Sequence, residues 1–280
     1  MEINEITIVC LGAYGDIINS TPIAKHYKKE GKFVRWVAKD RYISVLKNND
    51  CIDELLTLNN SISNNVLLTN KFKSLYLPKE KEKVIYTAPY MSKFYDGTPR
   101  STLLDIIKNE TSNISKWNCE FKPTIGLSKD EVNEAKAFIS LVEGENKILV
   151  EFENFSDQTF FDKKVLNELF RKISGSFILT GLKKPDWFEE LKTLYPDSKF
   201  YFYNGSFKSN AEIYNHCNLF IGCCSGITCL TSSDYCFNSE VNRIECCNGP
   251  HWSSMAWEHN NKNKTLCFCE EDFKHALEML

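Results

Sequence analysis

The sequence predicts an α/β protein built from two Rossmann-like lobes that face a cleft. Short apolar segments alternate with helical patterns along most of the 280 residues, which favours parallel sheets covered by helices. Two of the apolar segments end in glycine turns that open helices, at Gly12 and at Gly222. The alternation breaks between residues 126 and 146, so we expect one domain over 1–143 and another over 144–280.

The first half is expected to hold four strands and several helices. Its strands are predicted at 5–11, 33–37, 54–58 and 84–86, and its helices at 16–30, 40–47 and 103–108. The polar stretch 59–82 indicates loops. Ser128 followed by Glu131 is a capping box, and it predicts a connecting helix to about Val142.

The second half repeats the alternation. Strands are expected at 147–152, 176–180, 199–203, 219–222, 241–246 and 265–268, and helices at 165–173, 187–195, 210–217, 227–232 and 272–280. Such alternation implies a parallel sheet, and the turn at Gly222 stands at the carboxyl end of one of its strands, where ligands bind in open α/β sheets.

Composition limits the classes of function. Lys and Arg number 34 against 37 Asp and Glu, a net charge of −3, which argues against a general nucleic-acid binder. No apolar run approaches the ~20 residues needed to span a bilayer, and the acidic start does not resemble a signal peptide. We therefore expect a cytoplasmic protein, with peripheral association at the inner face of a membrane left open.

Nine of the twelve cysteines fall in the C-terminal quarter. A disulfide framework is typical of small secreted domains, and zinc sites usually need C-x2-4-C pairs. The close pairs here, such as Cys223-Cys224 and Cys246-Cys247, do not have that spacing. We expect no metal, and interpret these residues as small buried side chains of a reduced protein.

The first glycine turn places an acidic residue at a helix start. Gly12, Tyr14 and Gly15 form the turn and Asp16 follows it. The spacing G-x-x-G-D differs from the G-x-G-x-x-G of dinucleotide sites. Asp16 is therefore interpreted either as a helix cap, favoured by the helix dipole, or as a general base.

The second turn suits an anion. Cys224, Ser225 and Gly226 follow a strand, and Ile227 and Thr228 begin a helix. Free N–H groups at such a helix start could bind a phosphate or diphosphate. The alternative is ordinary strand-to-helix turn chemistry, without a ligand.

Two further segments are weaker candidates. Polar residues of the loop after 147–152 are expected to face the cleft, as is the glycine that ends the strand at 176–180: Ser156, Gln158, Thr159 and Gly181. The alternative is a solvated loop. His251 and Trp252 stand in a late loop, where they could stack on a base or sugar or be structural.

Three segments resemble the ADP-heptose:lipopolysaccharide heptosyltransferases, which are inverting glycosyltransferases of the GT-B fold. The stretch from Gly15 to Pro22 is similar to the opening G-D-x-x-x-x-x-P of that family. The stretch 123–131 resembles its interdomain segment, and 211–226 resembles the helix, strand and S/T-G turn of its donor lobe.

The resemblance implies a transferase that moves a heptose or other hexose-type sugar from a nucleotide-diphosphate donor to a glycan or protein acceptor of the bacterial surface. Asp16 would be the general base, with Gly12, Tyr14 and Gly15 on the acceptor side. The turn at 225–228 would hold the donor diphosphate, without metal or other cofactor.

Cys224 stands where the family usually has an acidic residue, Cys229 where it often has histidine, and Gln158 and Thr159 near the place of a lysine. A degenerate relative that binds nucleotide or glycan without turnover is the alternative.

Overall fold

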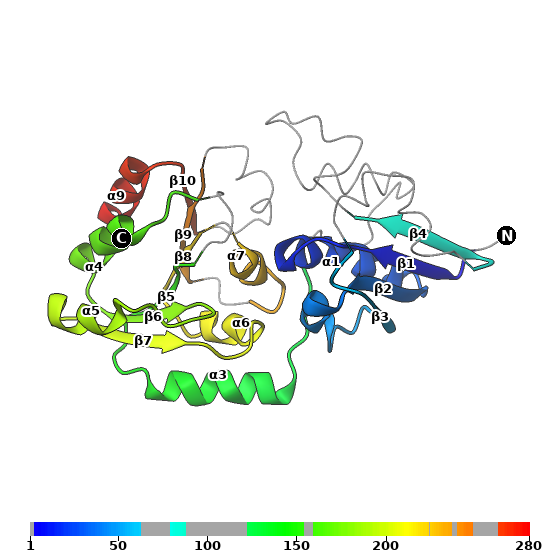
Figure 1. Cartoon of the computed structure of the whole chain (residues 1–280), viewed down its shortest axis with the longest axis horizontal. Helices are drawn as coiled ribbons and strands as arrows, with labels where there is room; N and C mark the ends of the chain where they lie inside the picture. The colour runs from blue at the N-terminus through cyan, green and yellow to red at the C-terminus, as the bar shows by residue number, and fades with distance from the viewer. Residues whose placement is uncertain are drawn as a thin grey trace. The chain divides into compact units, whose positions relative to one another are not determined.

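The computed structural model describes residues 3–62, 79–87, 122–153, 159–223, 225–236, 240–248 and 263–280. By its contacts the chain divides into two compact units, with the division between Leu127 and Ser128. Each unit contains one parallel sheet, as the sequence predicts (Figure 1). The helix predicted at 103–108 lies outside the described residues.

The first unit holds a four-stranded sheet in the order β3-β2-β1-β4. Its elements are β1 (Glu5–Val9), α1 (Tyr14–Lys29), β2 (Phe33–Lys39), η1 (Asp40–Leu46), β3 (Glu54–Leu58) and β4 (Glu82–Tyr86). All of its strand pairs are parallel. The segment predicted as a helix at 40–47 is a 3₁₀ helix, and α1 starts two residues earlier than predicted.

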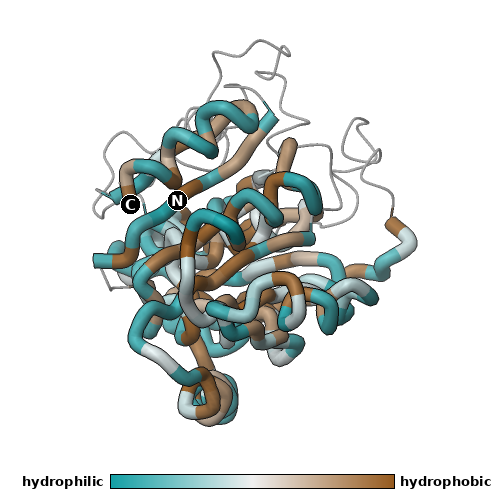
Figure 2. The backbone as a smooth tube through the Cα atoms, turned by 90° about the vertical axis from the view of Figure 1, so that its left-hand side faces the viewer, coloured by the Kyte–Doolittle hydropathy of each residue, from teal (hydrophilic) through white to brown (hydrophobic). Residues whose placement is uncertain are grey.

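The second unit holds a six-stranded sheet in the order β10-β9-β8-β5-β6-β7. Its strands are β5 (Lys147–Glu151), β6 (Ser176–Thr180), β7 (Lys199–Tyr203), β8 (Leu219–Gly222), β9 (Asn242–Cys246) and β10 (Lys264–Cys267). Its helices are α3 (Lys129–Leu141), α4 (Lys163–Lys172), α5 (Phe188–Leu194), α6 (Ser209–Tyr214), α7 (Gly226–Leu230) and α9 (Glu270–Glu278). In Figure 2 hydrophobic segments run through the interior and hydrophilic ones lie mainly along the outer helices.

The capping box at the start of α3 forms as predicted. The Ser128 hydroxyl accepts from the Glu131 N–H at 3.2 Å, and the Glu131 carboxylate accepts from the Ser128 N–H at 2.7 Å. Helix α3 packs against α6, so by contacts it belongs to the second unit. The domain boundary at 143/144 and the roles assigned to the two domains stay predictions.

Helix α1 contains Pro22, which has no N–H to give to the Ile18 carbonyl one turn earlier. The Thr21 hydroxyl donates to that carbonyl instead, at 2.7 Å. The same hydroxyl accepts from the backbone N–H of Thr124 at 2.8 Å. The Asn49 side-chain amide donates to the Thr124 carbonyl, also at 2.8 Å. Thr124 lies in the segment that leaves the first unit, and both its backbone N–H and its carbonyl are thus hydrogen-bonded to that unit.

Gly126 lies in the same segment and is closely packed. A Cβ atom at this position would lie 1.6 Å from the Asn48 carbonyl oxygen, so any side chain would displace the backbone. The glycine therefore permits the segment to pack closely against the Asn48 backbone just before α3 begins.

We predict that Thr21→Val lowers the free energy of unfolding by about 2–4 kcal/mol, because two buried backbone groups lose their partner while the side-chain shape is kept. Chemical denaturation measures the change. Thr57→Val, at an exposed position of β3, is the matched control and should be nearly neutral. Equal stability of the two variants would contradict the bridging role of Thr21.

Candidate functional site

The first glycine turn folds the Asp16 carboxylate back over the end of β1. Asp16 is buried in the first turn of α1, and its Oδ2 accepts from the Ala13 N–H at 2.9 Å. A Cβ at Gly12 would lie 2.3 Å from that same oxygen, so only glycine allows this approach. The structure thus contains the capping interaction that the sequence suggested, and the role of Asp16 as a base stays a prediction.

Tyr14 and Gly15 complete the turn and are half-buried. The Tyr14 ring meets the Tyr42 ring edge-on at 5.1 Å between centroids. Its hydroxyl donates to the Arg41 carbonyl at 3.1 Å. Tyr14 therefore anchors the turn to the 3₁₀ helix η1, and its predicted contact with an acceptor is untested.

The second glycine turn joins β8 to α7. Ser225 is the N-cap of α7, and its hydroxyl accepts from the Ile227 N–H at 3.3 Å. Thr228 is fully buried, with its hydroxyl directly above Gly222. A Cβ at Gly222 would lie 2.6 Å from the Thr228 Oγ1. Gly222 therefore leaves space for a hydroxyl that faces the sheet.

The hydroxyl groups of this turn are directed toward a buried carboxylate, which the sequence analysis did not single out. Glu151 ends β5 and is 1% exposed. Its Oε2 accepts from the Thr228 hydroxyl at 2.8 Å and from the Cys223 N–H at 3.2 Å, and its Oε1 accepts from the Ser225 hydroxyl. Burial raises the pKa of the Glu151 carboxyl group, although these hydrogen bonds oppose the shift.

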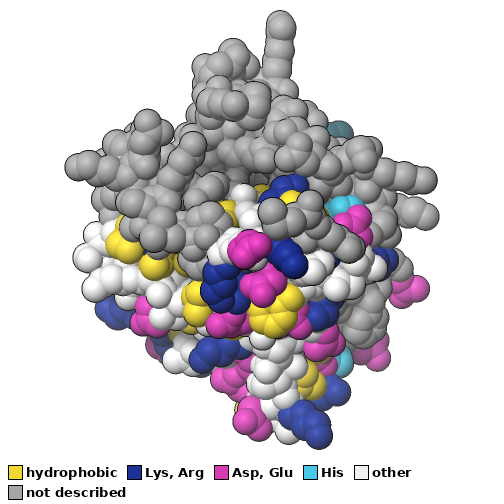
Figure 3. Space-filling model, turned by 90° about the vertical axis from the view of Figure 1, so that its right-hand side faces the viewer, with side chains coloured by type: hydrophobic (Ala, Val, Ile, Leu, Met, Phe, Trp, Pro, Cys, Tyr) yellow, Lys and Arg dark blue, Asp and Glu magenta, His cyan; other side chains and the backbone are white. Residues whose placement is uncertain are grey.

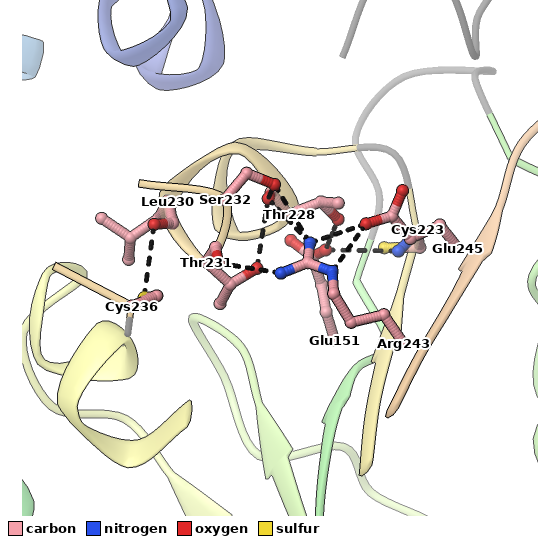
Figure 4. Close-up of polar contacts among 9 residues, drawn as sticks. All are labelled: Glu151, Cys223, Thr228, Leu230, Thr231, Ser232, Cys236, Arg243 and Glu245. Atoms are coloured by element: carbon pink, nitrogen blue, oxygen red, sulfur yellow. Dashed lines mark hydrogen bonds and ion pairs between the residues drawn. The ribbon is translucent and has the colours of Figure 1, made fainter. Parts of the chain in front are cut away.

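The other end of α7 is held by a buried ion pair on β9 (Figure 4). Arg243 Nη2 lies 2.6 Å from Glu245 Oε1, and both side chains are 0% exposed. Arg243 also donates to the Thr231 carbonyl at 2.8 Å and to the Thr228 carbonyl at 3.4 Å. Carbonyls at a helix C-terminus lack partners within the helix, and Arg243 supplies donors to two of the carbonyls at this end of α7.

The remaining donor-side candidates in the described residues lie at the same edge of the second sheet. The Thr159 hydroxyl donates to the Cys246 carbonyl at 2.8 Å, which ties the loop after β5 to the end of β9. A Cβ at Gly181 would lie 2.7 Å from Glu153 Oε2, so this glycine accommodates a neighbouring side chain. Five predicted site residues fall outside the described residues: Ser156, Gln158, Cys224, His251 and Trp252.

The sequence carries a signal for the residues that were missed. Glu151 ends the apolar strand segment KILVE, and Arg243 and Glu245 alternate with apolar residues in NRIEC. A charged residue inside a buried strand is unusual unless it is paired. A carboxylate at the end of an apolar strand segment is therefore the signal that could have pointed to Glu151.

All ten cysteines in the described part are free thiols, and eight of them are buried. Burial raises the pKa of the Cys217 and Cys247 thiols to about 12, so they are neutral at physiological pH. This agrees with the expectation of small buried side chains. Within the described ranges, no group of three or more His, Cys, Asp or Glu side chains is arranged to hold a metal ion.

One face of the described surface carries mixed charge. On the face shown in Figure 3, acidic and basic side chains lie interspersed, in keeping with the net charge of −3. Among the helices of the described residues, none combines the length and the apolar character that a membrane span requires.

The fold is shared with known glycosyltransferases. A glycosyl transferase of family 9 from Veillonella parvula superposes with a TM-score of 0.61 at 14% identity, over 95% of this chain and 87% of that one. The E. coli heptosyltransferase WaaC with ADP gives a TM-score of 0.58 at 10% identity, over 98% and 99% of the two chains. E. coli ADP-heptose lps heptosyltransferase II gives 0.57 at 11% identity, with the same coverage.

No protein-family model and no curated protein matches the sequence. At identities of 10 to 14% the structural likeness establishes the fold alone. The expected resemblance to heptosyltransferases and the expected GT-B type of α/β fold are thereby confirmed.

We predict that Glu151→Gln changes how stability depends on pH. Because burial raises the pKa of Glu151 above its unfolded value of about 4.3, its contribution is largest below that value and is lost as the pH rises through the folded pKa. The free energy of unfolding of the wild type minus that of Glu151→Gln should therefore fall as the pH rises above the unfolded value. Urea denaturation of both proteins at a series of pH values measures it. A difference that is flat or rises with pH would rule out the raised pKa.

Proposed function

We propose that this chain is an inverting glycosyltransferase that moves a sugar from a nucleotide-diphosphate donor to a glycan or protein acceptor without a metal ion. One observation carries the proposal. A buried carboxylate, Asp16, is held by the backbone at the carboxyl end of β1, in a chain whose fold is that of heptosyltransferases. Ligands of open α/β sheets bind at such strand ends.

Asp16 would act as the general base. The Ala13 N–H holds one oxygen of its carboxyl group at 2.9 Å, and the Gly12 turn fixes its orientation. In the proposed reaction Asp16 removes the proton of the acceptor hydroxyl while the oxygen attacks the anomeric carbon. The bond from that carbon to the diphosphate oxygen breaks, and the configuration of the sugar inverts.

The turn at the start of α7 would hold the leaving diphosphate. Ser225, Gly226 and Ile227 are half-buried and so reach the surface, whereas Thr228 is fully buried. Thr228 would therefore act through the Glu151 carboxyl group below the turn rather than by direct contact. Fixed donors at the site of developing negative charge contribute electrostatic stabilisation.

The family differences at Cys224 and Cys229 fall on the donor side, so they bear on which nucleotide sugar is used. A place in the synthesis of bacterial surface glycans, in the cytoplasm or at the inner face of the membrane, fits the resemblance. ADP is the first nucleotide to test, because the fold neighbour WaaC was solved with it.

A module that binds nucleotide without turnover is the second candidate. It is favoured by the hydrogen bonds that the Ser225 and Thr228 hydroxyls already donate to Glu151. Calorimetry with ADP, GDP, UDP and CDP, combined with an assay for nucleotide release from the matching sugar donors, separates the two. Binding without release across a broad acceptor panel would favour the module.

We predict that Asp16→Asn lowers the transfer rate at least about 100-fold, because the amide cannot take the proton. Donor binding and the fold should be kept, since the Asn oxygen can still accept from Ala13. Nucleoside diphosphate release in the presence of acceptor is the measurement. The matched control is Asp50→Asn, at an exposed position after η1, which should retain full activity. A fully active Asp16→Asn variant would refute the assignment.

A further inference from the structure

Glu151 belongs to a layer of charged side chains between the second sheet and α7. Glu245 lies beside Gly222 on the neighbouring strand. Val150 lies beside Ile221, so the next step of the same register places Glu151 on the other side of Gly222. Two carboxylates therefore flank one glycine, and the Thr228 hydroxyl occupies the space above it. Figure 4 shows the layer from the side.

The layer has one carboxylate more than it has cations. The Arg243 guanidinium is committed to Glu245, with Nε and Nη2 both donating to Oε1 at 3.0 and 2.6 Å. Within the described part of the chain, no Lys, Arg or His side chain pairs with Glu151. Its partners are two hydroxyl groups and the N–H groups of Cys223 and Ile227. Neutral donors compensate a buried negative charge only in part.

The Ser225 hydroxyl is the group that links this layer to the surface. A serine hydroxyl has one hydrogen to donate, and here it points inward to Glu151. The same oxygen accepts from the Ile227 N–H at 3.3 Å. The Ser225 oxygen therefore keeps one free lone pair and no free hydrogen, so in this state it would repel a phosphate oxygen.

We propose that Glu151 takes up a proton when a nucleoside diphosphate binds the turn at Ser225, and that the Glu151–Ser225 hydrogen bond reverses its direction. The protonated Glu151 then donates to the Ser225 oxygen, and the Ser225 hydrogen turns outward to the phosphate. The added proton stays on Glu151, so the buried layer becomes neutral as the anion arrives. Glu151 is thus a positioning residue, and the inference rests on the proposed function.

The groups around Glu151 permit this protonation. On β6, Thr180 lies beside it and donates to Asn210 at 2.7 Å. Directly after β8, the Cys223 thiol donates to the Glu153 carbonyl at 3.4 Å. On α7 only hydroxyl and N–H groups face it, and on β9 the charge of Arg243 is balanced by Glu245. The raised pKa of Glu151 agrees with this environment.

The test is proton-linked binding of ADP, or of whichever of GDP, UDP and CDP binds the wild type more tightly. Titration calorimetry in buffers of different ionisation enthalpy gives the number of protons taken up. We expect the wild type to take up more protons than Glu151→Gln, by up to one. The affinity of the wild type for the nucleotide, divided by that of Glu151→Gln, should fall as the pH rises, by at most about tenfold per pH unit. Equal proton uptake in the two proteins would overturn the inference.

Two further variants make the result specific. Glu153→Gln removes a carboxylate at the same sheet edge that accepts from the Leu182 N–H, and it should keep the proton uptake of the wild type. Ser225→Ala lacks the hydroxyl that reverses, so it should bind ADP more weakly and take up fewer protons. If Glu151→Gln does not fold, unchanged proton uptake in Ser225→Ala overturns the inference. Failure of the wild type to bind any of the four nucleotides would refute the proposed function instead.

Discussion

A buried carboxylate has to find its hydrogen-bond donors within the fold, and the turn between β8 and α7 in the second unit meets this requirement. Glu151 ends β5 below the turn and accepts from Cys223, Ser225 and Thr228. Arg243 fixes the other end of α7 from β9. A helix of five residues is too short to be stable alone, so α7 depends on these buried charges for its position.

In the first unit a buried carboxylate is held by a backbone group. Gly12 allows the Asp16 carboxylate to approach the end of β1, and the Ala13 N–H holds it there. Further along α1, Thr21 replaces the donor that Pro22 lacks and also binds the segment that leads to α3. The proline that belongs to the opening motif is thus tolerated because a neighbouring hydroxyl satisfies the freed carbonyl. The same motif thus also anchors the segment that leads to α3.

Sequence patterns were sufficient for the elements and for the two glycine turns, because apolar periodicity, the Ser128–Glu131 capping box and glycine are local signals. They were not sufficient for the direction of a side chain. Ser225 and Thr228 appeared as groups that would face a phosphate, whereas both donate to Glu151. Glu151 itself went unnoticed, because its partners stand more than seventy residues away in the chain.

The sequence by itself determined the α/β class, the parallel strands, the two strand-to-helix turns and the resemblance to heptosyltransferases. Only the tertiary structure decided which polar groups of those turns are already engaged. The reason is physical: a buried charge is compensated by whatever donors the sheet register brings beside it, and register joins residues such as Gly222 and Glu245 that no local pattern connects.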